Sequence, residues 1–155
     1  MKSARAGMAA VLVDTNVLVY AHDRSEPDKQ EKAIRVLDAL EVGGNGRLIA
    51  QVLGEFFRAT TKPPALMLTQ EQAQQQIDNF IASWTILDTT SMVVQEAVRG
   101  VRTHHLSYYD AQVWAAARLN QVGVVFSEDF AEGSTVEGVR FVNPFSDGFV
   151  LEAWI

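Results

Sequence analysis

The chain has 155 residues, a formal net charge of −6 at pH 7 and no cysteine. With 48% apolar and 21% charged residues, it is suited to one globular domain around a hydrophobic core. The lack of cysteine excludes disulfides, thiol nucleophiles and cysteine-ligated metal sites, and the acidic charge disfavours a broad nucleic-acid-binding surface, which needs Lys and Arg.

The N-terminal segment lacks the features of an export signal. Its short apolar stretch ends at Val13, because Asp14 follows, and no small-residue cleavage site comes after it. No run in the sequence approaches the about 20 apolar residues that are needed to cross a bilayer. We therefore expect a cytoplasmic protein without membrane association, in which residues 1–8 form an N-terminal extension.

Strands and helices alternate along the chain. Residues 9–13 (AAVLV) form a continuous apolar run, which predicts a buried strand of a parallel sheet. Helix starts are marked by Pro27 in a first turn and by the capping-box spacing of Thr69 and Gln72. In chain order, we predict a strand at 9–13, helices at 16–22 and 25–40, a strand at 47–51, helices at 52–61 and 69–84, a strand at 85–88, helices at 91–102 and 107–120, a strand at 122–127, a loop at 128–138 and a last strand at 139–145.

This alternation predicts a layered α/β fold with a parallel sheet. The carboxyl ends of the strands in such a sheet lie along one edge, where these folds usually build their sites. Asp14 directly follows the first predicted strand, so we expect it at that edge.

Four acidic residues are placed to meet there. Asp14 and Asp129 follow predicted buried strands, whereas Glu55 and Asp110 lie on apolar helices. Each alone has an ordinary explanation: N-capping for Asp14, a helix flank for Glu55, first-turn capping for Asp110 and a turn for Asp129. Together they favour a bound cation, because clustered carboxylates repel one another unless neutralised, and Mg²⁺ or Mn²⁺ prefers oxygen ligands.

Four segments carry a more specific resemblance: VLVDTNVLVYA at 11–21, GEFFRATTKP at 54–63, LSYYDAQVWAAA at 106–117 and VVFSEDFAEG at 124–133. In this order they resemble the motifs of the PIN-domain ribonucleases, and most closely those of the VapC-type toxins of bacterial toxin–antitoxin pairs. The resemblance covers about residues 9–145, which we expect to form a single PIN domain on which residues 146–155 dock. It implies a PIN-like three-layer sandwich, an α/β fold with a central, mainly parallel sheet flanked by helices.

The resemblance also implies roles for individual residues. The family's acidic positions, which act as catalytic metal ligands, fall on Asp14, Glu55, Asp110 and Asp129. Glu128 remains an alternative for the fourth of these. The polar positions, which orient the metal shell or the phosphate, fall on Thr15, Asn16 and Ser127.

The activity implied by the resemblance is that of an Mg²⁺- or Mn²⁺-dependent endoribonuclease, in which a metal-activated water attacks the RNA phosphodiester. A homodimer is implied as well, together with a cognate antitoxin protein that wraps the toxin and blocks its site. Basic residues near the motifs either contact RNA phosphates or lie on solvated helix faces; they are Arg58, Lys62, Arg99, Arg102 and Arg118.

Other interpretations stay open at this point. A PIN-like module could bind RNA or protein without cutting, although all four acidic positions are filled. A PIN nuclease of RNA maturation outside toxin–antitoxin systems would carry the same residues. A phosphatase of the haloacid dehalogenase type is disfavoured, because it would place a second Asp two residues after Asp14, where this chain has Asn16.

Overall fold

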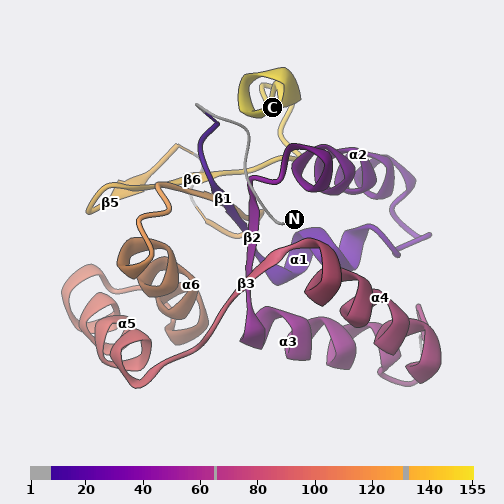
Figure 1. Cartoon of the computed structure of the whole chain (residues 1–155), viewed down its shortest axis with the longest axis horizontal. Coiled ribbons are helices and arrows are strands. Elements are labelled where there is room, and N and C mark those ends of the chain that lie inside the picture. Colours follow the sequence, from indigo (N-terminus) through magenta and orange to yellow (C-terminus); the bar gives the residue numbers. More distant parts are fainter. Residues whose placement is uncertain (1–7, 65, 131–132) are drawn as a thin grey trace.

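A six-stranded sheet runs through the centre of the protein, as a computed structural model that describes residues 8–64, 66–130 and 133–155 shows (Figure 1). The strand order is β3-β2-β1-β4-β6-β5. The strands are β1 Val11–Val13, β2 Gly46–Ile49, β3 Thr85–Leu87, β4 Val124–Phe126, β5 Thr135–Val136 and β6 Val139–Val142. Five of them pair in parallel, and β5 is antiparallel to β6, so the predicted mainly parallel sheet is confirmed.

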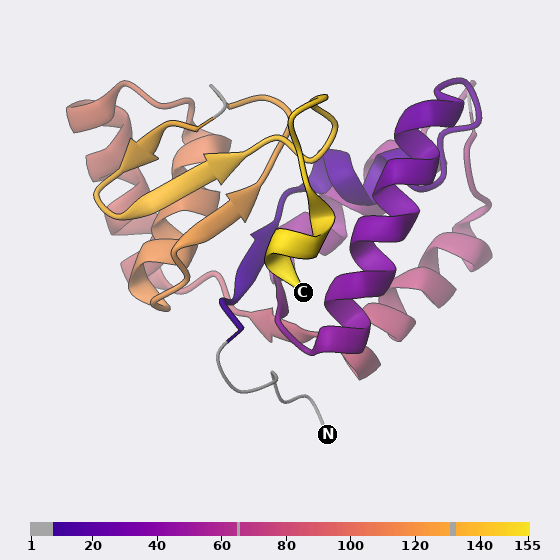
Figure 2. The same ribbon diagram turned by 90° about the horizontal axis from the view of Figure 1, so that it is seen from above.

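Helices flank this sheet on two sides. They are α1 Thr15–Tyr20, α2 Pro27–Gly43, α3 Ala50–Thr61, α4 Gln70–Ser83, α5 Ser91–His104 and α6 Tyr108–Leu119, followed by a 3₁₀ helix at Leu151–Trp154. In Figure 1, α2 and the C-terminal end lie above the strands, and α3, α5 and α6 lie below them. In Figure 2, seen from above, the C-terminal segment lies between α2 and the strands β4 and β6. In the described ranges, no helix has the length and apolar character that a membrane crossing requires.

The prediction of a loop over residues 128–138 is wrong in one part, because Thr135–Val136 form strand β5. Glu137 and Gly138 join β5 to β6 with φ values of 47° and 84°, as in a two-residue hairpin turn with both residues in the left-handed region. Asn or Asp usually precedes the glycine of such a turn. With Glu in that place, the sequence gives no recognisable hairpin signal.

The centre of the core is β1, where Val11, Leu12 and Val13 are all 0% exposed. This strand lies between β2 and β4 in the sheet, and helices pack on both of its faces, which explains its continuous apolar sequence. The C-terminal segment contacts the next strand: Phe149 and Trp154 meet the ring of Phe126 edge-to-face, with ring centroids 5.4 and 5.5 Å apart.

Gly46 in β2 provides a test of how tightly the sheet is packed. A Cβ atom at this position would collide with the indole ring of Trp84, which is 2% exposed. We expect Gly46→Ala to lower the free energy of unfolding by about 1–3 kcal/mol, because overpacking strains a close-packed core. Urea unfolding followed by circular dichroism measures the change.

Gly54→Ala is the matched control, because Gly54 is inside α3 and, apart from adjacent residues and the helix's own backbone, no heavy atom lies within 4 Å of the added Cβ. Alanine is the better helix former, so this variant should be unchanged or more stable by roughly 0.5–1 kcal/mol. Equal destabilisation by the two substitutions would contradict the packing of Gly46 against Trp84.

Candidate active site

The carboxyl ends of β1 and β4 lie side by side at one edge of the sheet. Val13 and Phe126 are register partners, and the backbone N–H of Asp14 donates to the carbonyl oxygen of Phe126 at 2.9 Å. Ser127, the next residue after β4, is 1% exposed and donates its hydroxyl to Asp14 Oδ2 at 2.9 Å. The sheet therefore brings Asp14 and Ser127 into contact from distant parts of the chain.

Asp14 is also the N-cap of α1. Its Oδ1 accepts a hydrogen bond from the backbone N–H of Thr15 at 2.8 Å. The ordinary capping explanation for this residue is thus correct, and it is compatible with the predicted position at the sheet edge. Both carboxylate oxygens are engaged by the protein, which fixes the orientation of the side chain.

The first turn of α1 contacts two of the other acidic residues. Thr15 donates its hydroxyl to Glu55 Oε2 at 2.7 Å, and Asn16 donates its amide to Asp129 Oδ2 at 3.1 Å. On α3, Gln51 donates to the second oxygen of Glu55 at 3.2 Å. The polar residues after Asp14 therefore hold acidic side chains from α3 and from the segment after β4.

These acidic side chains line one cavity of about 510 Å³. Its walls are formed by Asp14, Thr15, Asn16, Val19, Tyr20, Asp23, Glu55, Ala59, Tyr109, Asp110, Glu128 and Asp129. All four acidic residues singled out by the sequence are present, whereas Ser127 supports Asp14 without lining the cavity. None of these wall residues is Lys or Arg, so the cavity is strongly acidic.

Two of the acidic side chains have raised pKa values. The pKa of Asp14 is raised to about 6, mainly by burial; the hydrogen bonds from Ser127 and Thr15 lower it, and the charges of Asp110 and Glu55 add to the rise. Burial also raises the pKa of Asp110, with a contribution from the charge of Asp129. A cation between these groups would relieve both the repulsion and the cost of burying the carboxylates.

The donor set fits a hard divalent cation. Every candidate ligand is an oxygen, which suits Mg²⁺ or Mn²⁺ and not a soft metal. Within the described part of the chain, no three His, Asp or Glu side chains converge closely enough to hold a metal ion directly. Mg²⁺ commonly keeps several waters and binds through one or two carboxylates, so this wider spacing is compatible with it.

A family model for the PIN domain matches residues 11–131. The chain belongs to the PIN domain family. The resemblance carried by the four sequence segments is therefore confirmed at the level of the family and its fold.

Solved structures of similar fold include several toxins, although each is less than 20% identical to this PIN domain. VapC20 of Mycobacterium tuberculosis, a toxin that cleaves the sarcin–ricin loop, is 14% identical with a TM-score of 0.62, over 77% of this chain and 90% of that chain. A toxin–antitoxin complex from Klebsiella pneumoniae is 17% identical with a TM-score of 0.63, over 87% and 98%. VapBC2 from Rickettsia felis, bound to a DNA fragment of its promoter, is 16% identical with a TM-score of 0.61, over 86% and 98%. No curated protein sequence matches the chain.

Two neighbouring carboxylates, Glu128 and Asp129, have different partners in this PIN domain. Glu128 Oε1 accepts the hydroxyl of Tyr20 at 2.8 Å, and its Oε2 forms an ion pair with Lys29 Nζ at 2.7 Å. Asp129 accepts a hydrogen bond from Asn16 and lies close enough to Asp110 to raise the pKa of that residue. Sequence reasoning did not single out Tyr20 or Lys29, because nothing in α1 or α2 indicates which loop they contact.

The basic residues near the motifs do not line the acidic cavity. Arg99 and Arg118 are instead ion-paired with Glu96, through Nε atoms 2.6 and 2.8 Å from its carboxylate oxygens. Arg99 also pairs with Glu137 in the β5–β6 turn at 2.8 Å. This network joins α5 and α6 to the hairpin, so these two arginines have structural partners.

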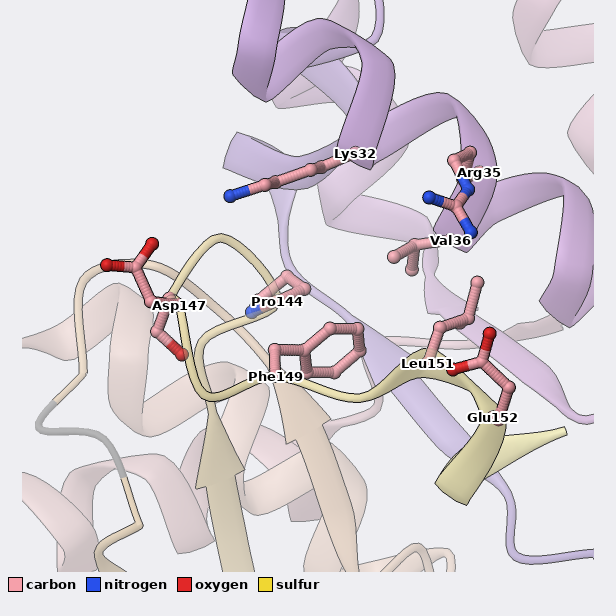
Figure 3. A pocket seen from close by; sticks show the side chains of 9 residues that line it. Lys32, Arg35, Val36, Pro144, Asp147, Phe149, Leu151 and Glu152 are labelled. Atoms are coloured by element: carbon pink, nitrogen blue, oxygen red, sulfur yellow. The ribbon is translucent and has the colours of Figure 1, made fainter.

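A second hollow, of about 240 Å³, lies between α2 and the C-terminal segment (Figure 3). Lys32 and Arg35 line it from α2, and Glu152 lines it from the 3₁₀ helix. The Lys32 ammonium group already donates to the carbonyl oxygen of Phe145 at 3.3 Å. With opposite charges spread over an apolar floor, this hollow lacks the convergent carboxylates of the first cavity.

Replacing Asp14 tests how much its buried, ionised carboxylate destabilises the folded protein. The pKa is about 6 in the folded protein and 3.8 for the unperturbed group, so the folded state holds the proton more strongly. Protonated Asp14 therefore adds to the free energy of unfolding below about pH 4, and this contribution is lost as the pH rises through about 6. Without divalent cations, Asp14→Asn should raise the free energy of unfolding at pH 7 on the order of 1–3 kcal/mol, because Asn caps helices equally well.

The gain should disappear at pH 4, which urea unfolding at several pH values measures. Asp38→Asn, on the exposed face of α2, is the control for the loss of one surface charge. An Asp14→Asn protein that is less stable than the wild type at both pH values would show that the carboxylate itself is needed for folding.

Proposed function

We propose that this PIN domain is an Mg²⁺- or Mn²⁺-dependent endoribonuclease that serves as the toxin of a toxin–antitoxin pair. The observation that carries the proposal is the acidic cavity, in which Asp14, Glu55, Asp110 and Asp129 come from four separate segments of the chain. A protein without chemistry at this edge would have little reason to gather four acidic side chains there. VapC20, a toxin that cleaves the sarcin–ricin loop, has a similar fold and supports the same conclusion.

In the proposed site, Asp14, Glu55, Asp110 and Asp129 hold the metal ion directly or through water. When bound, the ion would lower the pKa of a water molecule and neutralise charge on a phosphoryl oxygen. Ser127 fixes the rotamer of Asp14, while Thr15 and Asn16 fix Glu55 and Asp129 through the hydrogen bonds described above. The raised pKa of Asp14 and of Asp110 means that the cation also keeps these groups ionised.

We assign the fourth acidic position to Asp129. Both oxygens of Glu128 are occupied by Tyr20 and Lys29, and the ion pair with Lys29 neutralises its charge. Asp129 has only the amide of Asn16 as a hydrogen-bond donor to its carboxylate among the described side chains, and it lies near Asp110. Its carboxylate is therefore the more available of the two for a cation.

The partners that we propose are an RNA substrate, a cognate antitoxin protein and a second copy of the chain in a cytoplasmic homodimer. Structures of similar fold include a toxin–antitoxin complex from Klebsiella pneumoniae, VapBC2 from Rickettsia felis with a promoter DNA fragment, and DNA-bound VapBC from Salmonella typhimurium. These complexes support an antitoxin for this chain as well.

The first test is cleavage of structured and single-stranded RNAs by the purified protein with Mg²⁺, with Mn²⁺ or with EDTA. We expect cleavage that requires the metal. Asp14→Asn and Asp129→Asn should each lose more activity than the about 10–100-fold that is typical when a partner behind a metal ligand is removed. Glu128→Gln is the matched variant for the fourth position and should lose less than about tenfold.

If Glu128→Gln loses cleavage activity and Asp129→Asn keeps it, our assignment of the fourth acidic position to Asp129 is wrong. A protein that neither cleaves any RNA nor binds Mg²⁺ or Mn²⁺ in calorimetry would favour the non-catalytic binding module.

A second test addresses the toxin role separately from the nuclease role. Expression of the wild-type chain alone in bacteria should slow growth, because free toxin cleaves cellular RNA. Asp14→Asn at equal protein level, checked by immunoblotting, should restore normal growth. Normal growth with the active wild-type enzyme would favour a PIN nuclease of RNA maturation.

A further inference from the structure

Two tyrosines stand out among the aromatic residues of the chain. Of the eight Phe, three Trp and three Tyr residues, only Tyr108 and Tyr109 are exposed in the described structure, and the others are buried or half-buried. Tyr109 is 63% exposed and Tyr108 is 39% exposed. Large aromatic side chains are usually buried, so an exposed pair at one place points to contact with another molecule.

Tyr109 is part of the wall of the acidic cavity. It directly precedes Asp110 in the first turn of α6, so its backbone is held about 3.8 Å, Cα to Cα, from that of a proposed metal ligand. The turn is fixed by Ser107, which caps the helix through the backbone N–H of Asp110 at 3.3 Å. The ring itself contacts Tyr108 edge-on, with centroids 5.7 Å apart and planes at 69°.

The cavity offers a nucleic acid few other contacts. No Lys or Arg is among the described residues that line its walls, and Lys29 is paired with Glu128. Affinity for a polyanion usually comes from such cations. Apart from the metal ion proposed at the acids, contacts that need no charge are therefore left to the described wall residues, and an exposed aromatic face beside the acids is suited to stack on a base.

We propose that Tyr109 is a stacking platform for an unpaired base of the RNA, next to the phosphate that lies at the acidic residues. The inference rests on the proposed nuclease function and adds to it a residue that positions the substrate by stacking on a base beside the scissile phosphate. A base inside a duplex has both faces covered by its neighbours, whereas a base in a loop or a single strand leaves a face free.

The test is the binding of a single-stranded RNA oligonucleotide that carries one 2-aminopurine, whose fluorescence falls when the base stacks. Ca²⁺ replaces Mg²⁺, and gels monitor whether the oligonucleotide stays intact. We expect Tyr109→Ala to remove most of the quenching and to weaken binding at least about fivefold, in line with the loss of one base–aromatic stack. Tyr109→Phe keeps the ring and should bind like the wild type.

Val98→Ala is the control for the loss of an exposed apolar side chain, because Val98 is 45% exposed on α5 and does not line the cavity. It should bind RNA like the wild type. A fully paired duplex of the same sequence should bind more weakly than the single strand to the wild-type protein.

Unchanged quenching and affinity in Tyr109→Ala, or equal affinity for the duplex, would overturn the proposal whether or not the protein cleaves RNA. Sedimentation of Tyr109→Ala distinguishes a protein contact: a change in oligomeric state with unchanged RNA binding would assign the tyrosine to an interface between copies of the chain. Cleavage by the wild-type protein is scored separately, so a failure of the stacking platform and a failure of the nuclease function remain distinguishable.

Discussion

The parallel pairing of β1 with β4 is the constraint on which the site depends. The register that sets Val13 beside Phe126 also sets the next residues, Asp14 and Ser127, beside each other. A slip of one residue in this pairing would turn every side chain of the strand to the opposite face and carry Asp14 away from its partners. The burial of β1 prevents such a slip, because its three valine and leucine side chains are fully enclosed by helices and neighbouring strands.

The site holds its negative charges with neutral donors. Hydroxyl, amide and backbone N–H groups contact Asp14, Glu55 and Asp129, and none of these three forms an ion pair within the described part of the chain. Neutral donors orient a carboxylate without cancelling its charge. The protein therefore keeps the groups in place and leaves neutralisation to a ligand, which agrees with the raised pKa of Asp14.

The sequence predicts this arrangement in part, for physical reasons that differ between residues. Asp14 and Asp129 were predictable because they follow buried strands, and the carboxyl ends of parallel strands share one edge. The sequence left the choice between Glu128 and Asp129 open, because our proposal of Asp129 depends on contacts of Glu128 with α1 and α2, about 100 residues earlier in the chain. The hairpin of β5 was missed since Glu137 is an unusual residue for its turn.

Three consecutive residues each contact a different side chain of the proposed site. Asp14 accepts a hydrogen bond from Ser127, Thr15 donates one to Glu55, and Asn16 donates one to Asp129. Each residue of an α-helix is rotated by about 100° from the one before it. An insertion or deletion between β1 and α1 would rotate Thr15 and Asn16 away from Glu55 and Asp129 at once, even with every amino acid retained. The spacing of this junction is thus as much a part of the site as its chemistry, so related chains that keep the site should vary in length elsewhere, for example after Asp129, and not here.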